Sequence, residues 1–188
     1  MRVDPATGLL AGARYVPSPH QDDRPPGTEI ELLVVHGISL PPGSFGGPWI
    51  ERLFLGTLPT EAHPYFATIN PRVSAHLLVR RSGRIVQYVP FHRRAWHAGA
   101  SSWRGRERVN DFSVGVEVEG AESVPYEAAQ YRALAAAVAA LAAAWPALGE
   151  DGRVVSHAEV APERKTDPWA SFDWGRFRSL LAARRDQR

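Results

Sequence analysis

Residues 31–36, Glu-Leu-Leu-Val-Val-His, constrain the fold more than any other stretch of the chain. Their apolar run is continuous rather than alternating, which is typical of a strand buried on both faces in the interior of a sheet. The run ends in His36, and a side chain at the end of such a strand projects into the crevice where sheet proteins bind ligands. A core histidine bonded to a backbone carbonyl fits the same pattern. The stretch therefore predicts an interior strand that ends in either a site residue or a core residue.

Period-two and helical patterns divide the rest of the chain into further strands and helices. Apolar and polar residues alternate most strictly in residues 111–120. Two further runs of alternating apolar and polar residues, on either side of Arg81-Ser82-Gly83, predict a β-hairpin. Residues 125–145 carry an apolar stripe among strong helix formers, with Ser123 or Val124 as the cap. The predicted strands are 31–36, 73–80, 84–90, 111–120 and 153–155, and the predicted helices are 48–54, 125–145 and 172–184. Residues 1–28 show no sustained period and are expected to form an irregular wrap.

Length and composition limit the class of protein. The 188 residues suit a single domain, 1–188, and the absence of cysteine leaves histidine and carboxylate as the metal ligands. A formal charge of +2, without a basic run that contains aromatic residues, argues against nucleic-acid binding. The first five residues lack the apolar core of a signal peptide, and the apolar run 133–148 is too short to span a membrane. We therefore expect a cytoplasmic enzyme that binds neither nucleic acid nor membrane, and we expect it to be a monomer.

A polar loop at residues 156–168 contains the densest set of potential metal ligands. His157, Lys165 and Asp167 lie within eleven residues there. Imidazole and carboxylate are good zinc ligands, and a catalytic zinc needs three protein ligands and an open position. The loop can supply two of them, His157 and Asp167, unless it is simply a polar surface loop. From the residues alone, the candidates for the third ligand are His36, His76 and His97.

Glu117 is the candidate general base. It lies on the polar face of the alternating strand 111–120, together with Ser113, Gly115 and Glu119. If this face lines a cleft, Glu117 can take a proton from water and pass it to a leaving amine, and Gly115 leaves room for substrate. Lys165 can then stabilise the oxyanion of a tetrahedral intermediate. The alternative is a solvated face that carries two carboxylates.

Trp96 and His97 form an aromatic and imidazole pair just after the predicted hairpin. An indole beside a hydrogen-bonding imidazole suits the binding of a sugar or a peptide. It equally suits a packed corner with a partly exposed polar tip.

Motifs along nearly the whole chain follow one another in a specific order. They include Leu-Val-Val-His at 33–36, Phe-Gly-Gly-Pro-Trp-Ile at 45–50, Arg-Val-Ser-Ala-His at 72–76, Arg-Ala-Trp-His-Ala-Gly at 94–99, Gly-Val-Glu at 115–117 and Ala-Pro-Glu-Arg-Lys-Thr-Asp-Pro at 161–168. In this order they resemble the zinc-dependent N-acetylmuramoyl-L-alanine amidases of the type 2 class, and most closely the AmpD type, the cytosolic 1,6-anhydro-N-acetylmuramyl-L-alanine amidases of cell-wall recycling. The resemblance implies a single-domain α/β fold with a central mixed sheet, flanking helices and long active-site loops. The implied substrate is an anhydro-muropeptide.

The resemblance also implies residue roles, position by position. The implied ligands of one zinc ion per chain are His36, His157 and Asp167. The implied catalytic residues are Glu117 and Lys165. Two arginines, Arg72 and Arg108, are expected to hold a carboxylate of the substrate, since guanidinium pairs with carboxylate bidentately. The predicted substrate-binding set is Arg72, Arg108, Trp96, His97 and Gly37.

Two residues depart from the AmpD-type pattern. Gly37 follows the first implied ligand where these enzymes usually carry Asn, which removes a side-chain amide beside the metal. Trp169 follows Asp167-Pro168 where they usually have Gly, and we expect it to close one side of the cleft. Both departures concern substrate binding rather than the class of reaction.

Two other functions fit the same fold. One is a lysin-type amidase that acts on intact murein. The other is a non-catalytic peptidoglycan-recognition module, although such modules typically lack one of the metal ligands, and all three positions are filled in this chain.

Overall fold

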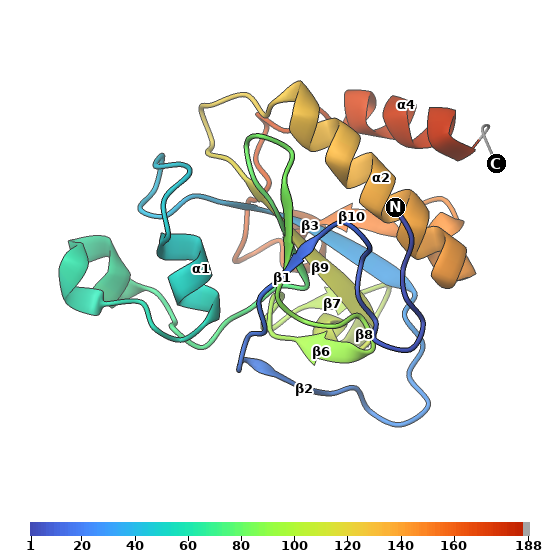
Figure 1. Ribbon diagram of the computed structural model, residues 1–188, viewed down its shortest axis with the longest axis horizontal. Helices are drawn as coiled ribbons and strands as arrows, with labels where there is room; N and C mark the ends of the chain where they lie inside the picture. Colours follow the sequence, from blue (N-terminus) through green and yellow to red (C-terminus); the bar gives the residue numbers. More distant parts are fainter. Residues whose placement is uncertain (186–188) are drawn as a thin grey trace.

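A six-stranded mixed sheet forms the centre of the protein in a computed structural model that describes residues 1–185 (Figure 1). The strand order is β1-β5-β4-β9-β3-β10, and every neighbouring pair is parallel except β4 and β5. The strands are β1 (Arg14–Tyr15), β3 (Leu32–Ile38), β4 (Leu77–Val79), β5 (Ile85–Gln87), β9 (Ser113–Glu119) and β10 (Val154–Ser156). The predicted hairpin is therefore present as β4 and β5, and the mixed sheet is confirmed.

Within residues 1–185, four helices and several short elements surround the sheet. The helices are α1 (Trp49–Phe54), α2 (Ala128–Ala144), α3 (His157–Val160) and α4 (Trp174–Arg185), and the short 3-10 helices are η1 (Thr60–Ala62), η2 (Pro64–Thr68), η3 (Val109–Asp111) and η4 (Pro146–Gly149). Two small ribbons pair β2 (Gln21–Asp23) with β6 (Arg93–Ala95), and β7 (Ser102–Trp103) with β8 (Arg106–Glu107). Within residues 1–185, no helix is long and apolar enough to cross a membrane.

The continuous apolar run of β3 is explained by packing on both faces of the sheet. Leu33 and Val35 join the core beneath α2 and α4, which lie side by side over one face (Figure 1). Leu32 and Val34 point to the opposite face, where they pack with Phe112 and neighbouring apolar side chains. Because successive side chains of a strand alternate between faces, His36 belongs to this second face. The predicted interior strand is therefore confirmed.

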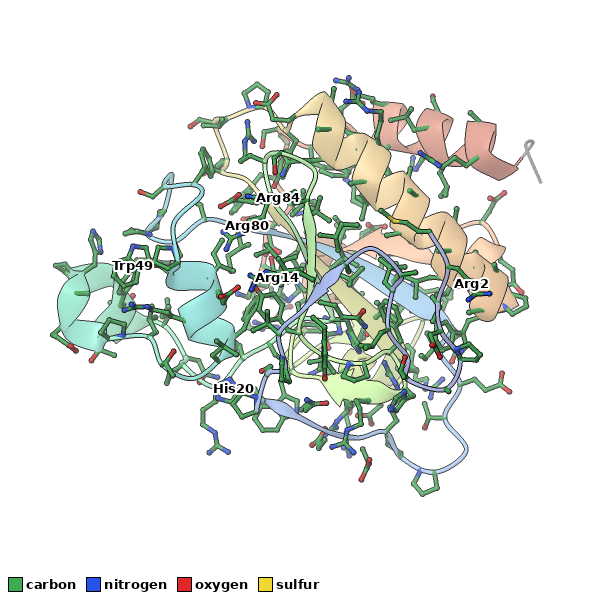
Figure 2. All side chains as sticks on the ribbon, in the orientation of Figure 1. Arg2, Arg14, His20, Trp49, Arg80 and Arg84 are labelled. Carbon is green, nitrogen blue, oxygen red and sulfur yellow. The ribbon has the colours of Figure 1, made fainter. Side chains whose placement is uncertain are left out.

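The polar face of β9 is largely buried rather than solvated, with only Glu117 partly exposed. Glu119 is 1% exposed and accepts hydrogen bonds from the Gly46 amide at 2.7 Å and the Arg81 amide at 3.1 Å. Its ion pair with Arg80 measures 3.1 Å, and Figure 2 shows Arg80 near Arg14, on the hairpin side of the sheet. Glu119 is thus a structural carboxylate that ties the 41–48 loop to the sheet.

Two predictions from the sequence were wrong: that residues 1–28 are irregular, and that Ser123 or Val124 caps helix α2. The first 28 residues are not wholly irregular, because β1 extends the sheet edge and β2 pairs with β6. Helix α2 begins at Ala128, so Ser123 and Val124 do not cap it; the Glu127 amide donates to the Gln130 side chain at 2.9 Å instead.

Candidate active site

The carboxyl ends of three parallel strands bring the predicted site residues to one edge of the sheet. His36 in β3 lies in register with Glu117 in β9. Ser156, the last residue of β10, lies in register with Val35, so His157 follows directly beside His36. Crevices outside the carboxyl ends of strands are where open α/β sheets bind ligands. The topology alone therefore brings these three side chains, from distant parts of the chain, together.

His157 is the first residue of a short helix, α3, and not part of a loop as the sequence analysis expected. The Ser156 hydroxyl accepts from the Glu159 amide at 3.0 Å, and the Glu159 carboxylate accepts from the Ser156 amide at 2.7 Å. This reciprocal pair is a capping box, whose signal, Ser-x-x-Glu, stands in the sequence at 156–159 and was overlooked. The cap fixes the direction in which the chain leaves β10, and with it the position of His157.

His36, His157 and Asp167 form a compact set of three potential ligands. The two Nδ1 atoms of the histidines are 2.9 Å apart, and Asp167 Oδ2 lies 3.1 Å from His157 Nδ1 and 3.5 Å from His36 Nδ1. All three residues are at most 9% exposed. Burial lowers the pKa of His36 to about 4, and the neighbouring His157 adds to the shift. His36 is therefore a neutral imidazole at neutral pH, the form that binds metals.

The donor chemistry of this set fits zinc. His157 Nε2 lies 3.3 Å from the Ala98 carbonyl oxygen, which only accepts, so Nε2 carries a hydrogen and Nδ1 is the nitrogen that can offer a lone pair to a metal. Asp167 offers a carboxylate oxygen, oriented by the Gly37 amide at 3.3 Å. Two imidazole nitrogens and one carboxylate, with all potential ligand atoms within 4.8 Å of one another, match a catalytic zinc site with an open position.

The two rival histidines point away from this set. His76 Nδ1 accepts from the Gly115 amide at 3.0 Å, and its Nε2 lies 3.1 Å from the Arg93 carbonyl oxygen. His97 Nδ1 lies 2.9 Å from His36 Nε2, on the side of His36 opposite the other two ligands. Of the three candidates for the third ligand, only His36 presents a nitrogen to His157 and Asp167.

Glu117 has a buried carboxylate oxygen without a partner. Its Oε2 is inaccessible to solvent and makes no hydrogen bond in the structure. Burial raises the pKa of Glu117 well above its ordinary value, the Asp167 charge raises it further, and Lys165 opposes the shift. Glu117 and Lys165 line a cavity of about 450 Å³ together with the three potential ligands. Glu117 therefore lines the cavity with a carboxylate that the protein leaves partly unpaired.

The predicted substrate-binding residues are only partly assembled around this cavity. Gly37 and His97 line it. Arg72 does not; its guanidinium lies over the indole of Trp96, 5.8 Å from the ring centroid. Arg108 pairs with Asp111 at 3.2 Å and lines a neighbouring groove formed by residues 99–102 and 160–164.

Residues that the sequence analysis did not select also line the cavity. Tyr65 in η2, with Thr68, Ile69 and Asn70, forms a wall from the arm between α1 and β4. The Tyr65 side chain is 37% exposed, and few other large hydrophobic side chains among the described residues are as exposed as this one. This arm has no regular period, which is why the sequence pattern alone gave it no role.

Gly37 and Trp169, the two departures from the AmpD-type pattern, lie against each other. A Cβ atom at position 37 would lie 2.5 Å from Cζ3 of the Trp169 ring and 2.5 Å from the Tyr126 hydroxyl. Trp169 lines the cavity, as expected, and its backbone has a left-handed φ of 61°. The indole therefore occupies the space that a side chain at position 37 would need.

Comparisons with known proteins place this arrangement in a family. Residues 26–170 match the N-acetylmuramoyl-L-alanine amidase family. The chain is 60% identical over 175 residues to the 1,6-anhydro-N-acetylmuramyl-L-alanine amidase AmpD of Citrobacter freundii. This alignment covers 93% of this chain and 92% of the relative. A crystal structure of a selenomethionine AmpD derivative matches with a TM-score of 0.92 and 59% identity, over 96% of this chain and 99% of that one.

A more distant structure is that of the amidase AmiD of Escherichia coli in complex with anhydro-N-acetylmuramic acid-L-Ala-D-γ-Glu-L-Lys. It matches with a TM-score of 0.59 and 29% identity, over 84% of this chain and 60% of that one. The chain therefore belongs to the N-acetylmuramoyl-L-alanine amidase family. Within it, the resemblance to AmpD-type enzymes is confirmed along almost the whole length of the chain.

Proposed function

We propose that this protein hydrolyses the amide bond between 1,6-anhydro-N-acetylmuramic acid and the L-alanine of the stem peptide, as a step in peptidoglycan recycling. The observation that carries the proposal is the unpartnered, buried oxygen of Glu117 in the same cavity as His36, His157 and Asp167. The AmpD relative is named for cleavage of the same bond, and the AmiD structure holds an anhydro-muropeptide.

One zinc ion per chain is the proposed cofactor, held by His36 Nδ1, His157 Nδ1 and Asp167 Oδ2. When bound, zinc supplies a Lewis acid that lowers the pKa of water and polarises a carbonyl oxygen. The protein prepares its side of the site through contacts behind the ligands. The Ala98 carbonyl fixes the hydrogen of His157 on Nε2, and the Gly37 amide orients the Asp167 carboxylate.

Glu117 is the proposed general base and then general acid. Its carboxylate accepts a proton from the attacking water and donates it to the nitrogen of the departing L-alanine, so that an amine leaves rather than an amide anion. A raised pKa suits both steps, because the carboxyl must hold the proton between them. The Lys165 ammonium, in the same cavity, is proposed to stabilise the negative charge on the carbonyl oxygen of the tetrahedral intermediate.

Substrate binding is proposed to extend beyond this cavity. Arg108 lines the neighbouring groove, where its exposed guanidinium suits a carboxylate of the stem peptide or the muramyl group. Arg72 and Trp96, stacked on each other, are proposed to hold another part of the substrate, and Gly37 is proposed to contact it from the cavity wall. The resemblance to AmpD-type enzymes extends the proposal to a monomer that acts in the cytoplasm on small muropeptides.

The test is a mass-spectrometric assay of purified protein with two substrates. One is an anhydro-muropeptide and the other is intact sacculi, each incubated with and without a metal chelator. We expect chelator-sensitive release of free peptide from the small substrate only. Cleavage of sacculi at a comparable rate would indicate a lysin-type amidase instead. Binding of either substrate without cleavage would indicate a recognition module and contradict the roles of Glu117 and Lys165.

A further inference from the structure

A chain of hydrogen bonds runs from the backbone of η3 to the first proposed metal ligand. The Ser113 hydroxyl donates to the Val109 carbonyl oxygen at 2.6 Å. A hydroxyl has one hydrogen, so the same oxygen must act as an acceptor toward His97 Nε2, 3.1 Å away. His97 therefore carries its hydrogen on Nε2. Since Ser113 is fully buried, water does not compete for these bonds.

The direction of this first bond determines the next one. A neutral imidazole carries one hydrogen, and with that hydrogen on Nε2 the Nδ1 of His97 is a lone-pair acceptor. His36 Nε2 lies 2.9 Å from that Nδ1 and must donate to it. The single hydrogen of neutral His36 is thereby held on Nε2, and Nδ1 faces His157 and Asp167 as a lone pair.

We infer that Ser113 and His97 form a relay that selects the metal-binding tautomer of His36. This inference rests on the proposed metal site. Neither residue is catalytic; both are positioning residues, and His97 acts through His36 rather than through a hydrogen bond to substrate, because both its ring nitrogens are already engaged.

The relay opposes a competing arrangement. Without an acceptor behind Nε2, the hydrogen of His36 would favour Nδ1, where Asp167 Oδ2 is 3.5 Å away and can accept it. That tautomer would place a hydrogen where a metal ion must bind. Ligand orientation by a partner on the second ring nitrogen is a general device of metal sites, and losing such a partner typically lowers metal affinity about 10–100-fold.

The His97 ring is fixed in place by close packing against β9. A Cβ atom at Gly115 would lie 2.3 Å from Cγ of the ring and 2.6 Å from its Cδ2. The backbone on either side is held as well, because the amides of His97 and Ala98 both donate to Asn110 Oδ1, at 3.2 and 2.8 Å. Gly115 therefore makes room for the imidazole of His97, where the sequence analysis expected it to make room for substrate.

Three variants and one control test the relay in the full-length protein. Ser113→Ala removes the acceptor for His97, and His97→Leu removes the acceptor for His36. His97→Asn is the conservative variant, since its Oδ1 can take the place of Nδ1 as acceptor. Ser18→Ala is the matched control, because Ser18 is also buried and also donates to a backbone carbonyl, that of Phe54, but its hydroxyl makes no hydrogen bond to His36 or His97.

Two readouts are used, neither of which depends on amidase activity. One is the zinc dissociation constant, from competition with a chromogenic chelator. The other is the ¹⁵N NMR signal of the His36 ring nitrogens in the zinc-free protein, which distinguishes the two tautomers. We expect wild type and Ser18→Ala to hold the hydrogen of His36 on Nε2. His97→Leu should shift it toward Nδ1 and weaken zinc binding about 10–100-fold, Ser113→Ala should act in the same direction to a smaller extent, and His97→Asn should recover most of the affinity.

An unchanged tautomer and an unchanged zinc dissociation constant in both His97→Leu and Ser113→Ala would overturn the relay. A weaker affinity that His97→Asn does not recover, with the His36 tautomer unchanged, would also overturn it, because this points to a packing role. The proposed function fails separately. A protein that shows the tautomer shift but releases no peptide from any muropeptide supports the relay and contradicts the amidase.

Discussion

The contact between Gly37 and Trp169 predicts that these two positions are energetically coupled. The perturbation is a set of three variants, Gly37→Asn, Trp169→Gly and the double variant, which exchange the two residues for those usual in AmpD-type enzymes. If the indole occupies the space of a side chain at position 37, Asn is tolerated only when the indole is removed. The two single substitutions should then not add up to the effect of the double variant.

The magnitude follows from the distances. A Cβ at position 37 would lie 2.5 Å from the Trp169 ring, about 1 Å inside an ordinary carbon–carbon contact. Overpacking of this kind costs about 1–3 kcal/mol. The same Cβ crowds the Tyr126 hydroxyl, which donates to the Pro168 carbonyl at 3.1 Å, a bond that contributes about 1 kcal/mol. We expect Gly37→Asn to lower the free energy of unfolding by about 3 kcal/mol alone, and by about 1 kcal/mol when Trp169 is Gly.

Trp169→Gly has two opposing effects. It removes an indole that packs against the main core, and it relieves a φ of 61°, a left-handed conformation that costs a side-chain-bearing residue about 1–2 kcal/mol. The assay is equilibrium urea unfolding of all four proteins with excess chelator, so that metal binding contributes to none of them. A coupling energy of about 2 kcal/mol is expected. Additivity within about 0.5 kcal/mol would refute the steric argument.

Two further stability predictions concern parts of the chain that hold the site in place. Arg24 donates to the carbonyls of Phe91, Asn110, Asp111 and Ser113 at 2.8–3.2 Å, so Arg24→Met should lower the free energy of unfolding by about 3 kcal/mol or more, because it leaves several buried acceptors unpaired. In the same urea assay Arg14→Met, at an exposed ion pair with Glu51, should cost under about 1 kcal/mol, and equal losses would contradict the reasoning. Ser156→Ala should cost about 1 kcal/mol through the lost cap and should also weaken zinc binding, because it loosens His157; an unchanged zinc dissociation constant would show that the cap does not position this ligand.

The spacing of apolar residues along the chain correctly predicted those strands in which that spacing follows the burial of the side chains. The apolar run of β3 indicated burial on both faces, and the alternation of β9 placed Glu117 on the face opposite Val116. Both predictions hold because a strand shows its environment through every second residue. The helix α2 was predicted with its start too early. Its chain stays extended up to Glu127, with Tyr126 bonded to Pro168 about 40 residues away, a contact that no local pattern can indicate.

The remaining parts of the site depend on contacts between distant segments. Arg24 stands in a stretch without any period, and the carbonyls that it bonds lie 67–89 residues further along the chain. The residues alone could not choose among three histidines for the third ligand. That choice followed from strand register, since β3 and β10 pair directly and bring His36 beside His157. The family resemblance supplied the same answer only because it carries such tertiary information.

The most direct test of the central claim is a joint measurement of bound zinc and amidase turnover in wild type, Glu117→Ala and Asp167→Ala. Zinc is measured by mass spectrometry of the native protein, and turnover by release of peptide from an anhydro-muropeptide. We expect one zinc per chain and full activity in wild type. We also expect one zinc with almost no turnover in Glu117→Ala, and neither zinc nor turnover in Asp167→Ala. Full turnover in Glu117→Ala, or one tightly bound zinc in Asp167→Ala, would contradict the account.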